Sequence, residues 1–145
     1  MRPAKLDYYL AIAKVVATRG TCIRRNFGAV IVKGDSIIST GYSGAPRGKV
    51  NCCDTMTCQR EELGCKPGER YELCRSVHAE QNAIIAVGRK ETTGSTLYLY
   101  GFEVKTNKSV SYDPCLLCKK MIINAGIEKV FVFPNRELIV VDWDI

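Results

Sequence analysis

The sequence predicts an α/β fold, in which helices cover both faces of a mixed five-stranded sheet to form a three-layer α/β/α sandwich. Three observations lead to this expectation: short apolar runs rich in β-branched residues, segments with helical periodicity between them, and a strand–helix–strand order near the C-terminus. The 145 residues suit one domain with its own core. Because no repeat or linker divides the chain, we expect residues 1–145 to form a single domain.

The N-terminal part is expected to contain a helix followed by a hairpin. Apolar residues recur at helical spacing up to about Arg19, and Gly20 follows as a stop signal. Residues 27–32 and 37–42 have the composition of strands, and the polar Lys33-Gly34-Asp35-Ser36 between them predicts an antiparallel hairpin. The apolar stripe of the helix consists of Leu6, Leu10, Ala13 and Ala17.

Residues 43–75 lack periodicity, and Gly, Pro, Cys and charged residues dominate there. A loop of roughly thirty residues is unusual inside a small domain unless it is functional or is held by something other than a core. Because cysteine is concentrated in this segment, we expect a metal to hold it.

The C-terminal half alternates between helix and strand. The run from residue 96 to residue 133 reads as strand, helix and strand, which predicts a parallel crossover. Residues 101–111 are polar and predict a short excursion or a hairpin. The expected helices are 78–88 and 115–125, and the expected strands are 96–100, 129–133 and 138–141.

Composition indicates a soluble protein with an anionic partner. The formal charge of +6 favours a nucleotide phosphate or a nucleic acid. No apolar run approaches the roughly 20 residues that cross a bilayer, and the N-terminus lacks the apolar core of a signal peptide. We therefore expect a cytoplasmic protein without membrane contact. Thiols stay reduced there, so the eight cysteines are expected to bind metal instead of forming disulfides.

Two short motifs carry ligands for a catalytic zinc. Cys115 and Cys118, three residues apart at the start of a helix, lie on one face and near the positive end of its dipole. His78 also begins a helix, and it reaches the same ion if the two helices start side by side on the sheet. Taken by itself, the cysteine pair could instead be a redox pair or a helix cap. Taken by itself, the histidine could instead be a core residue. Together they leave a fourth coordination position for water, which is typical of a catalytic zinc.

Glu80 is expected to transfer protons. It lies about 200° from His78 around an ideal helix, so it is not placed as a ligand on the same side. Zinc lowers the pKa of its water, and Glu80 then takes up the proton and passes it to the substrate. The alternative role for this carboxylate is to complement the helix dipole.

The motif H-x-E followed by P-C-x-x-C is typical of zinc-dependent nucleobase deaminases. Together with residues 28–32, 38–42, 44–46 and 78–84, it resembles the cytidine deaminase superfamily, and specifically its deoxycytidylate (dCMP) deaminase branch. The resemblance implies a cytidine deaminase-like fold, hydrolytic deamination of dCMP to dUMP with release of ammonia, and homo-oligomers, often hexamers.

The same resemblance implies the substrate contacts. Phe27 would pack on the base and Ser43 would face the sugar. Arg24 and Arg25 would lie near the phosphate, although an exposed pair at a loop end is the alternative. Ala79, which lies between the zinc ligand His78 and the proton-transfer residue Glu80, is the remaining expected contact with the substrate.

Two departures from the family leave other substrates open. The family usually has asparagine where Ser43 stands, and residues 101–113 form a longer run into the second motif. A relative of dCMP is therefore an alternative substrate. A nucleic-acid deaminase would need a basic, aromatic-lined channel, and the sequence has no such cluster. A catalytically silent, zinc-stapled binding module is the other alternative, against which the intact Glu80 argues.

A second, structural zinc is expected in the cysteine-rich segment. The resemblance implies that Cys22 and Cys52 are ligands, and Cys58 and Cys74 would complete a closed site of four thiolates. Cys53 and Cys65 are the substitutes for that choice. Free buried cysteines are the alternative interpretation.

Overall fold

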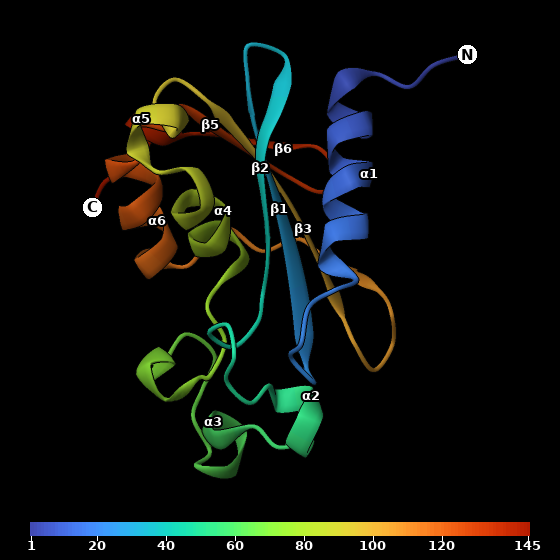
Figure 1. The fold of residues 1–145 in the computed structure, drawn as a ribbon, viewed down its shortest axis with the longest axis vertical. Helices are drawn as coiled ribbons and strands as arrows, with labels where there is room; N and C mark the ends of the chain where they lie inside the picture. The colour runs from blue at the N-terminus through green and yellow to red at the C-terminus, as the bar shows by residue number, and fades with distance from the viewer.

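The computed structural model describes all residues 1–145 and contains one mixed sheet between layers of helices (Figure 1). The sheet order is β2-β1-β3-β5-β6, and a short β4 pairs with β3. β3 and β5 are parallel, and all other pairs are antiparallel. The strands are β1 (Arg25–Lys33), β2 (Ser36–Tyr42), β3 (Thr96–Glu103), β4 (Ser109–Val110), β5 (Lys129–Val132) and β6 (Arg136–Ile139).

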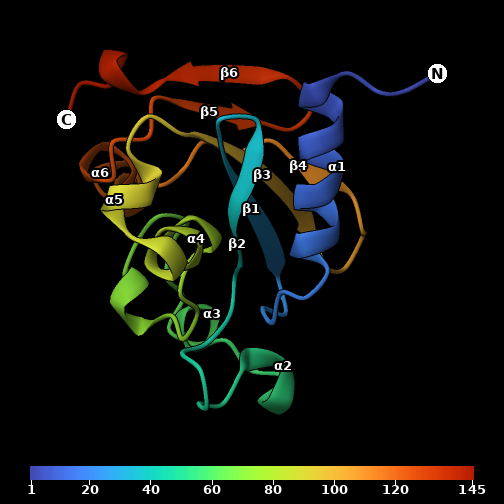
Figure 2. The same cartoon turned by 45° about the horizontal axis from the view of Figure 1, so that its top comes forward.

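Helices cover both faces, so the predicted three-layer α/β/α sandwich is confirmed. In Figures 1 and 2 helix α1 packs on one face of the sheet, while α4 and α6 pack on the other. No helix is both long and apolar enough to cross a membrane. The helices are α1 (Lys5–Ala17), α2 (Cys52–Thr55), α3 (Gln59–Glu62), α4 (Ala79–Val87), α5 (Arg89–Thr92) and α6 (Leu116–Asn124), with 3-10 turns η1 (Tyr71–Leu73) and η2 (Val140–Asp142).

The central strands divide their side chains between two cores. Val30 and Tyr98 belong to the core beneath α1, whereas Ile31 and Leu99 belong to the core beneath α4 and α6. Successive residues of a strand point to opposite faces, and here both faces are covered. This explains why β1 is a continuous apolar run instead of an alternating one.

Two glycines let helices pack directly on the strands. A Cβ atom on Gly28 of β1 would lie 2.2 Å from the carbonyl oxygen of Ala13 in α1. A Cβ atom on Gly41 of β2 would lie 2.4 Å from the carbonyl oxygen of Ala79 and 2.4 Å from the backbone nitrogen of Ala83. The first turns of α4 therefore rest on the backbone of β2.

The predicted hairpin between β1 and β2 is confirmed. Its loop is Gly34-Asp35, with φ of 57° and 59°. Positive φ at both central residues is the geometry of a type I′ turn, which matches the twist of the flanking strands. Residues 101–111 also form a hairpin, because β3 runs on to Glu103 and β4 pairs with it.

The structure corrects three expectations. The sheet has a sixth strand, the two-residue β4, beyond the five expected. Residues 43–75 contain single turns of helix in α2, α3 and η1, which are too short for periodicity to reveal. The last strand is residues 136–139 and not 138–141, because the chain turns into η2, where Val140 is buried beneath the sheet.

Candidate active site

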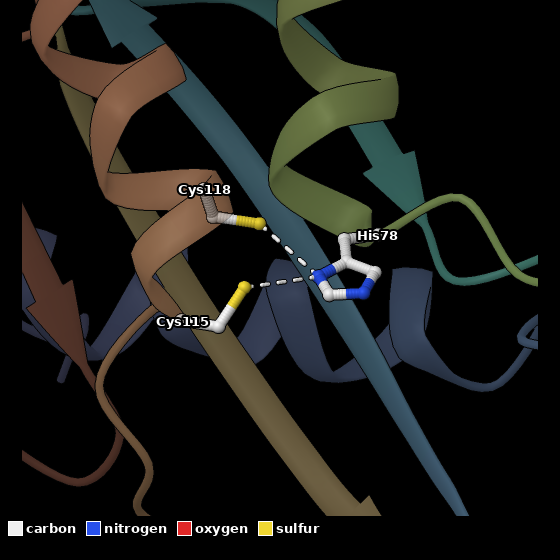
Figure 3. Close-up of side chains that lie close together, drawn as sticks. All are labelled: His78, Cys115 and Cys118. Carbon is white, nitrogen blue, oxygen red and sulfur yellow. Dashed lines mark hydrogen bonds between the residues drawn. The ribbon is translucent and has the colours of Figure 1, made fainter. Parts of the chain in front are cut away.

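The N-termini of α4 and α6 meet at one point of the sheet. His78 is the N-cap residue of α4, Cys115 is the N-cap residue of α6, and Cys118 lies in the first turn of α6. Nδ1 of His78 is 3.2 Å from Sγ of Cys118 and 3.4 Å from Sγ of Cys115 (Figure 3). The structure thus brings together three side chains whose donor atoms all lie within 4.8 Å of one another.

These three side chains fit a zinc ion. Tetrahedral zinc, with bonds of about 2.3 Å to sulfur and 2.0–2.1 Å to nitrogen, holds neighbouring N and S ligands about 3.6 Å apart. The two nitrogen–sulfur distances are only slightly shorter than this, so small side-chain rotations accommodate the ion. One imidazole and two sulfurs also match the ligand types that zinc prefers.

The thiols and the imidazole perturb one another strongly. A hydrogen bond from Cys118, followed by one from His78, lowers the pKa of Cys115 from 9.0 to about 4. The same hydrogen bond and burial raise the pKa of Cys118. The hydrogen bond with Cys115 raises the pKa of His78. A thiolate beside an imidazole and a second thiol favours binding of a cation, and the bound metal displaces the remaining protons.

His78 has two direct supports, and one of these is itself supported by Arg60. Its backbone N–H donates to Oε1 of Gln81 at 2.9 Å, which anchors the start of α4. The ring of Tyr71 meets its imidazole edge-on, with centroids 5.1 Å apart. The Arg60 guanidinium lies 4.7 Å from the Tyr71 ring centroid and donates to two carbonyl oxygens of residues 66–69. The cysteine-rich loop therefore braces the histidine through an aromatic ring.

Glu80 lies in the first turn of α4 and is only 5% exposed. Its side chain lines the same cavity as His78 and Cys115. Burial is the main cause that raises the pKa of Glu80, because a charged carboxylate loses its hydration there. A carboxyl group with a raised pKa exchanges protons more readily near neutral pH.

A cavity of about 360 Å³ opens beside these residues, which is the size of a small-molecule site. Phe27, Leu99 and Ala79 form apolar parts of its wall. The Phe27 ring contacts the backbone of β3 closely at Gly101, where a Cβ atom would lie 2.3 Å from a ring carbon. The position of the aromatic wall therefore depends on the glycine opposite.

The cavity-lining Ser43 is engaged by the backbone. Its Oγ accepts a hydrogen bond from the N–H of Phe27 at 2.8 Å and lies 3.3 Å from the carbonyl oxygen of Phe27. Both interactions join the end of β2 to β1. The hydroxyl expected to face a sugar is thus already hydrogen-bonded within the protein.

The two adjacent arginines line the cavity but have different partners. The Arg24 Nε is 3.3 Å from a carboxylate oxygen of Glu61. The Arg25 guanidinium has no ion pair and lies 5.2 Å from the ring centroid of Tyr112. Arg25 is therefore the arginine of this pair whose charge is not neutralised by a carboxylate.

The remaining cysteines form a looser group. The structure has no disulfide. Burial, followed by the proximity of Cys22, Cys74 and Cys58, raises the pKa of Cys52, so these four side chains lie near one another. Their sulfurs do not approach as closely as the three ligand atoms of the first group. Cys53, one of the two substitutes, is exposed.

Several cavity residues were not predicted from the sequence. Most of them come from the irregular segments 43–75 and 101–113, where no periodicity signals which side chains point inward; Ser76 follows the first segment and Leu99 lies in β3. Asp113, for example, forms an ion pair with Arg136, which is distant in sequence. The sequence offers only a general indication of such residues, namely that residues in long loops are often functional. The additional lining residues are Arg60, Pro67, Tyr71, Ser76, Leu99, Tyr112 and Asp113.

Residues 3–134 match the family model described as the cytidine and deoxycytidylate deaminase zinc-binding region. The chain is 38% identical to the deoxycytidylate deaminase of Mycobacterium phage D29, over 93% of this chain and 98% of the phage protein. It is 35% identical to the deoxycytidylate deaminase of Schizosaccharomyces pombe over 89% of its own length, but it spans only 37% of that protein.

Solved structures give the same result. The dCMP deaminase of cyanophage S-TIM5, crystallised with dCMP and dUMP, is 29% identical and superposes with a TM-score of 0.62. That superposition covers 90% of this chain and 82% of the phage chain.

Proposed function

Because the chain belongs to the family of cytidine and deoxycytidylate deaminases, we propose that it hydrolyses dCMP to dUMP and ammonia. One observation carries this proposal: a His-Cys-Cys triad and a buried glutamate lie together at a cavity of nucleotide size, which His78, Cys115 and Glu80 line. Residues 1–145 act as one deaminase domain. His78, Cys115 and Cys118 hold the zinc.

Glu80 moves the protons of the reaction. The bound zinc supplies Lewis acidity, which makes water nucleophilic near neutral pH. The Glu80 carboxylate accepts a proton from the attacking water as the water oxygen bonds to C4 of cytosine, and the resulting carboxyl group donates that proton to ring N3. Glu80 then transfers the second proton of the water, now on the C4 hydroxyl, to the amino group. The C4–N bond breaks, the C4 carbonyl forms and ammonia leaves. Burial of Glu80 keeps bulk water from competing for these protons.

The ring and the phosphate are bound at opposite ends of the cavity. Phe27 packs on the base, and the backbone at Ala79 lies beside it. Arg25 contacts the phosphate, because Arg24 already has a carboxylate partner. We expect R25A to raise KM for dCMP by more than tenfold, since charge-assisted hydrogen bonds are the strong ones. R24A is the matched control, and an equal effect of both changes would contradict this assignment.

Ammonia release from four substrates tests the function. We expect activity on dCMP and little on dCTP, on deoxycytidine or on an oligonucleotide containing deoxycytidine. Preference for the oligonucleotide would identify a nucleic-acid deaminase. Release from none of the four would identify a binding module without turnover.

A second zinc in the cysteine-rich loop is part of the proposal. Cys22, Cys52, Cys58 and Cys74 are its ligands, and their mutual proximity supports this choice. The backbone N–H of Arg24 also donates to Sγ of Cys22 at 3.4 Å, which fixes the position of that sulfur. Metal analysis of the purified protein should find two zinc ions per chain, and one in the C52S variant. A single zinc ion per chain in the unmodified protein would contradict the proposed second zinc site.

Assembly into a homo-oligomer, with a hexamer as the expected form, completes the proposal. Apolar side chains on the outer surface of α4 and α6 support it: Ile85 is 67% exposed and Leu116 is 58% exposed. Such residues are typical of surfaces that pack against another subunit. Analytical ultracentrifugation measures the assembly, and a monomer at micromolar concentration would contradict it.

A further inference from the structure

The segment that leads into α4 carries a serine beside the zinc-binding histidine. Val77 forms an isolated bridge with Gly44, and its N–H donates to the carbonyl oxygen of Gly44 at 2.7 Å. Residues two apart in an extended segment point to the same side. Ser76 and His78, which flank this bridge, accordingly both line the cavity.

The hydroxyl of Ser76 is buried and has no hydrogen-bond partner in the protein. Buried hydroxyl groups normally have a partner, because an unsatisfied one costs stability. Two other polar side chains of the cavity have partners: Ser43 is bonded to the Phe27 backbone, and Asp113 is paired with Arg136. The Ser76 hydroxyl is thus a polar group without a partner in the wall of the cavity, and because its oxygen is itself buried, the side chain must rotate toward the cavity to meet a ligand there.

We propose that the Ser76 hydroxyl binds the free hydroxyl of the substrate's deoxyribose, the 3′-hydroxyl. This inference rests on the proposed function. Two residues of extended chain span about 6.6 Å, so Ser76 lies about that far from His78 along the cavity wall. The base presents its reacting carbon to the zinc-binding residues, and the sugar lies across the pyrimidine ring from that carbon. The distance between Ser76 and His78 therefore matches the distance from the reacting carbon to the sugar. It is longer than the distance from the reacting carbon to its neighbouring ring atoms.

Ser43 already uses its hydroxyl proton and one lone pair in the contacts that join β2 to β1, so it cannot donate a hydrogen bond to a sugar hydroxyl without breaking one of them. Ser76 has no such bonds to lose. Recognition of the sugar therefore shifts from the end of β2 to the neighbouring extended segment, which the bridge between Gly44 and Val77 holds alongside it.

The test combines S76A with removal of the sugar hydroxyl. Kinetics are measured with dCMP and with 2′,3′-dideoxycytidine monophosphate, which lacks the 3′-hydroxyl. We expect S76A to lower kcat/KM for dCMP by roughly 3- to 12-fold, the effect of one neutral hydrogen bond. The variant should act on the dideoxy substrate as well as the wild type does. S76T keeps a hydroxyl and should retain the preference for dCMP.

S95A is the matched control. Ser95 likewise has a buried hydroxyl without a partner, but it precedes β3 and does not line the cavity. We expect this variant to leave kcat/KM unchanged for both substrates. Zinc content and melting temperature of both variants are measured alongside the kinetics.

Three results would overturn the inference: no loss in S76A, an equal loss with both substrates, or loss of zinc from S76A. The last two would indicate contact with another part of the nucleotide or a structural role. A wild-type protein that releases no ammonia from dCMP would overturn the proposed function itself, and the inference with it.

Discussion

The close contact between β2 and α4 makes Gly41 the most informative position to change. Gly41 is not in the cavity, yet it lies against the backbone of the turn that begins with His78. Alanine at this position adds a single methyl group. Its φ is not in the left-handed region, so the backbone itself tolerates alanine.

The expected displacement follows from the distances. The added methyl carbon would lie 2.4 Å from both the Ala79 carbonyl oxygen and the Ala83 nitrogen, whereas ordinary contacts begin at 3.4 Å. Both neighbours are backbone atoms, so α4 must move away from β2 by about 1 Å. Such a shift moves His78 and Glu80 relative to Cys115 and Cys118. Misplacement by about 1 Å reduces activity about a hundredfold, and overpacking lowers stability by about 1–3 kcal/mol.

The opposite face of the sheet provides the control. Alanine at Gly28 would press on α1 with similarly short distances, 2.2 Å to the Ala13 oxygen and 2.4 Å to the Ala17 nitrogen. Helix α1 carries no residue of the active site, so G28A should lose similar stability and keep most of its activity. Thermal unfolding gives the melting temperature of each variant, and kcat/KM for dCMP and zinc content are then measured below both melting temperatures.

Two outcomes would refute this reasoning. If G41A keeps wild-type activity and zinc content, the contact between β2 and α4 does not position the site. If G28A and G41A lose activity equally at equal stability, the loss reflects global loosening of the fold.

Three further predictions concern the active site and the hairpin. E80A should lower turnover at least about a hundredfold with zinc retained; loss of zinc as well would make Glu80 a ligand. Removal of metal by a chelator should abolish ammonia release, and added zinc should restore it; activity that persists without zinc would contradict the mechanism. Hydrogen bonds from Lys5 and then Tyr9 lower the pKa of Asp35 below its ordinary value of 3.8. The ionised Asp35 therefore stabilises the folded protein fully above pH 3.8, and this stabilisation is lost as the pH falls through the lowered pKa of the folded state. The melting temperatures of D35N and the wild type should therefore converge below about pH 4, and parallel curves down to pH 2.5 would argue against this contribution.

Much of the fold was predictable because helices, strands and turns are indicated by residues that are close together in the sequence. The stripe of α1, the composition of β1 and β2, and the Gly34-Asp35 turn each lie within a few residues of sequence. Periodicity and turn chemistry report on such short segments. Single turns of helix such as α2 and α3 are too short to give a period, and this is why the segment 43–75 appeared irregular.

The sequence by itself determined the chemistry available to this protein: one histidine, a cysteine pair spaced for one helix face, and a glutamate beside the histidine. It also placed the histidine and the cysteines at the starts of their helices, since those starts have local signals. Tertiary structure alone decided which side chains meet. The approach of His78 to Cys115 across 37 residues depends on both helices packing on the same face of the sheet.

The roles of neighbouring residues were also decided by packing. Identical residue types acquire different partners in the folded chain: Arg24 pairs with Glu61 while Arg25 does not, and the Ser43 hydroxyl is bonded while that of Ser76 is not. Hydrogen bonds and ion pairs act over a few ångströms in space. Sequence spacing cannot specify such contacts between segments that only the fold brings together.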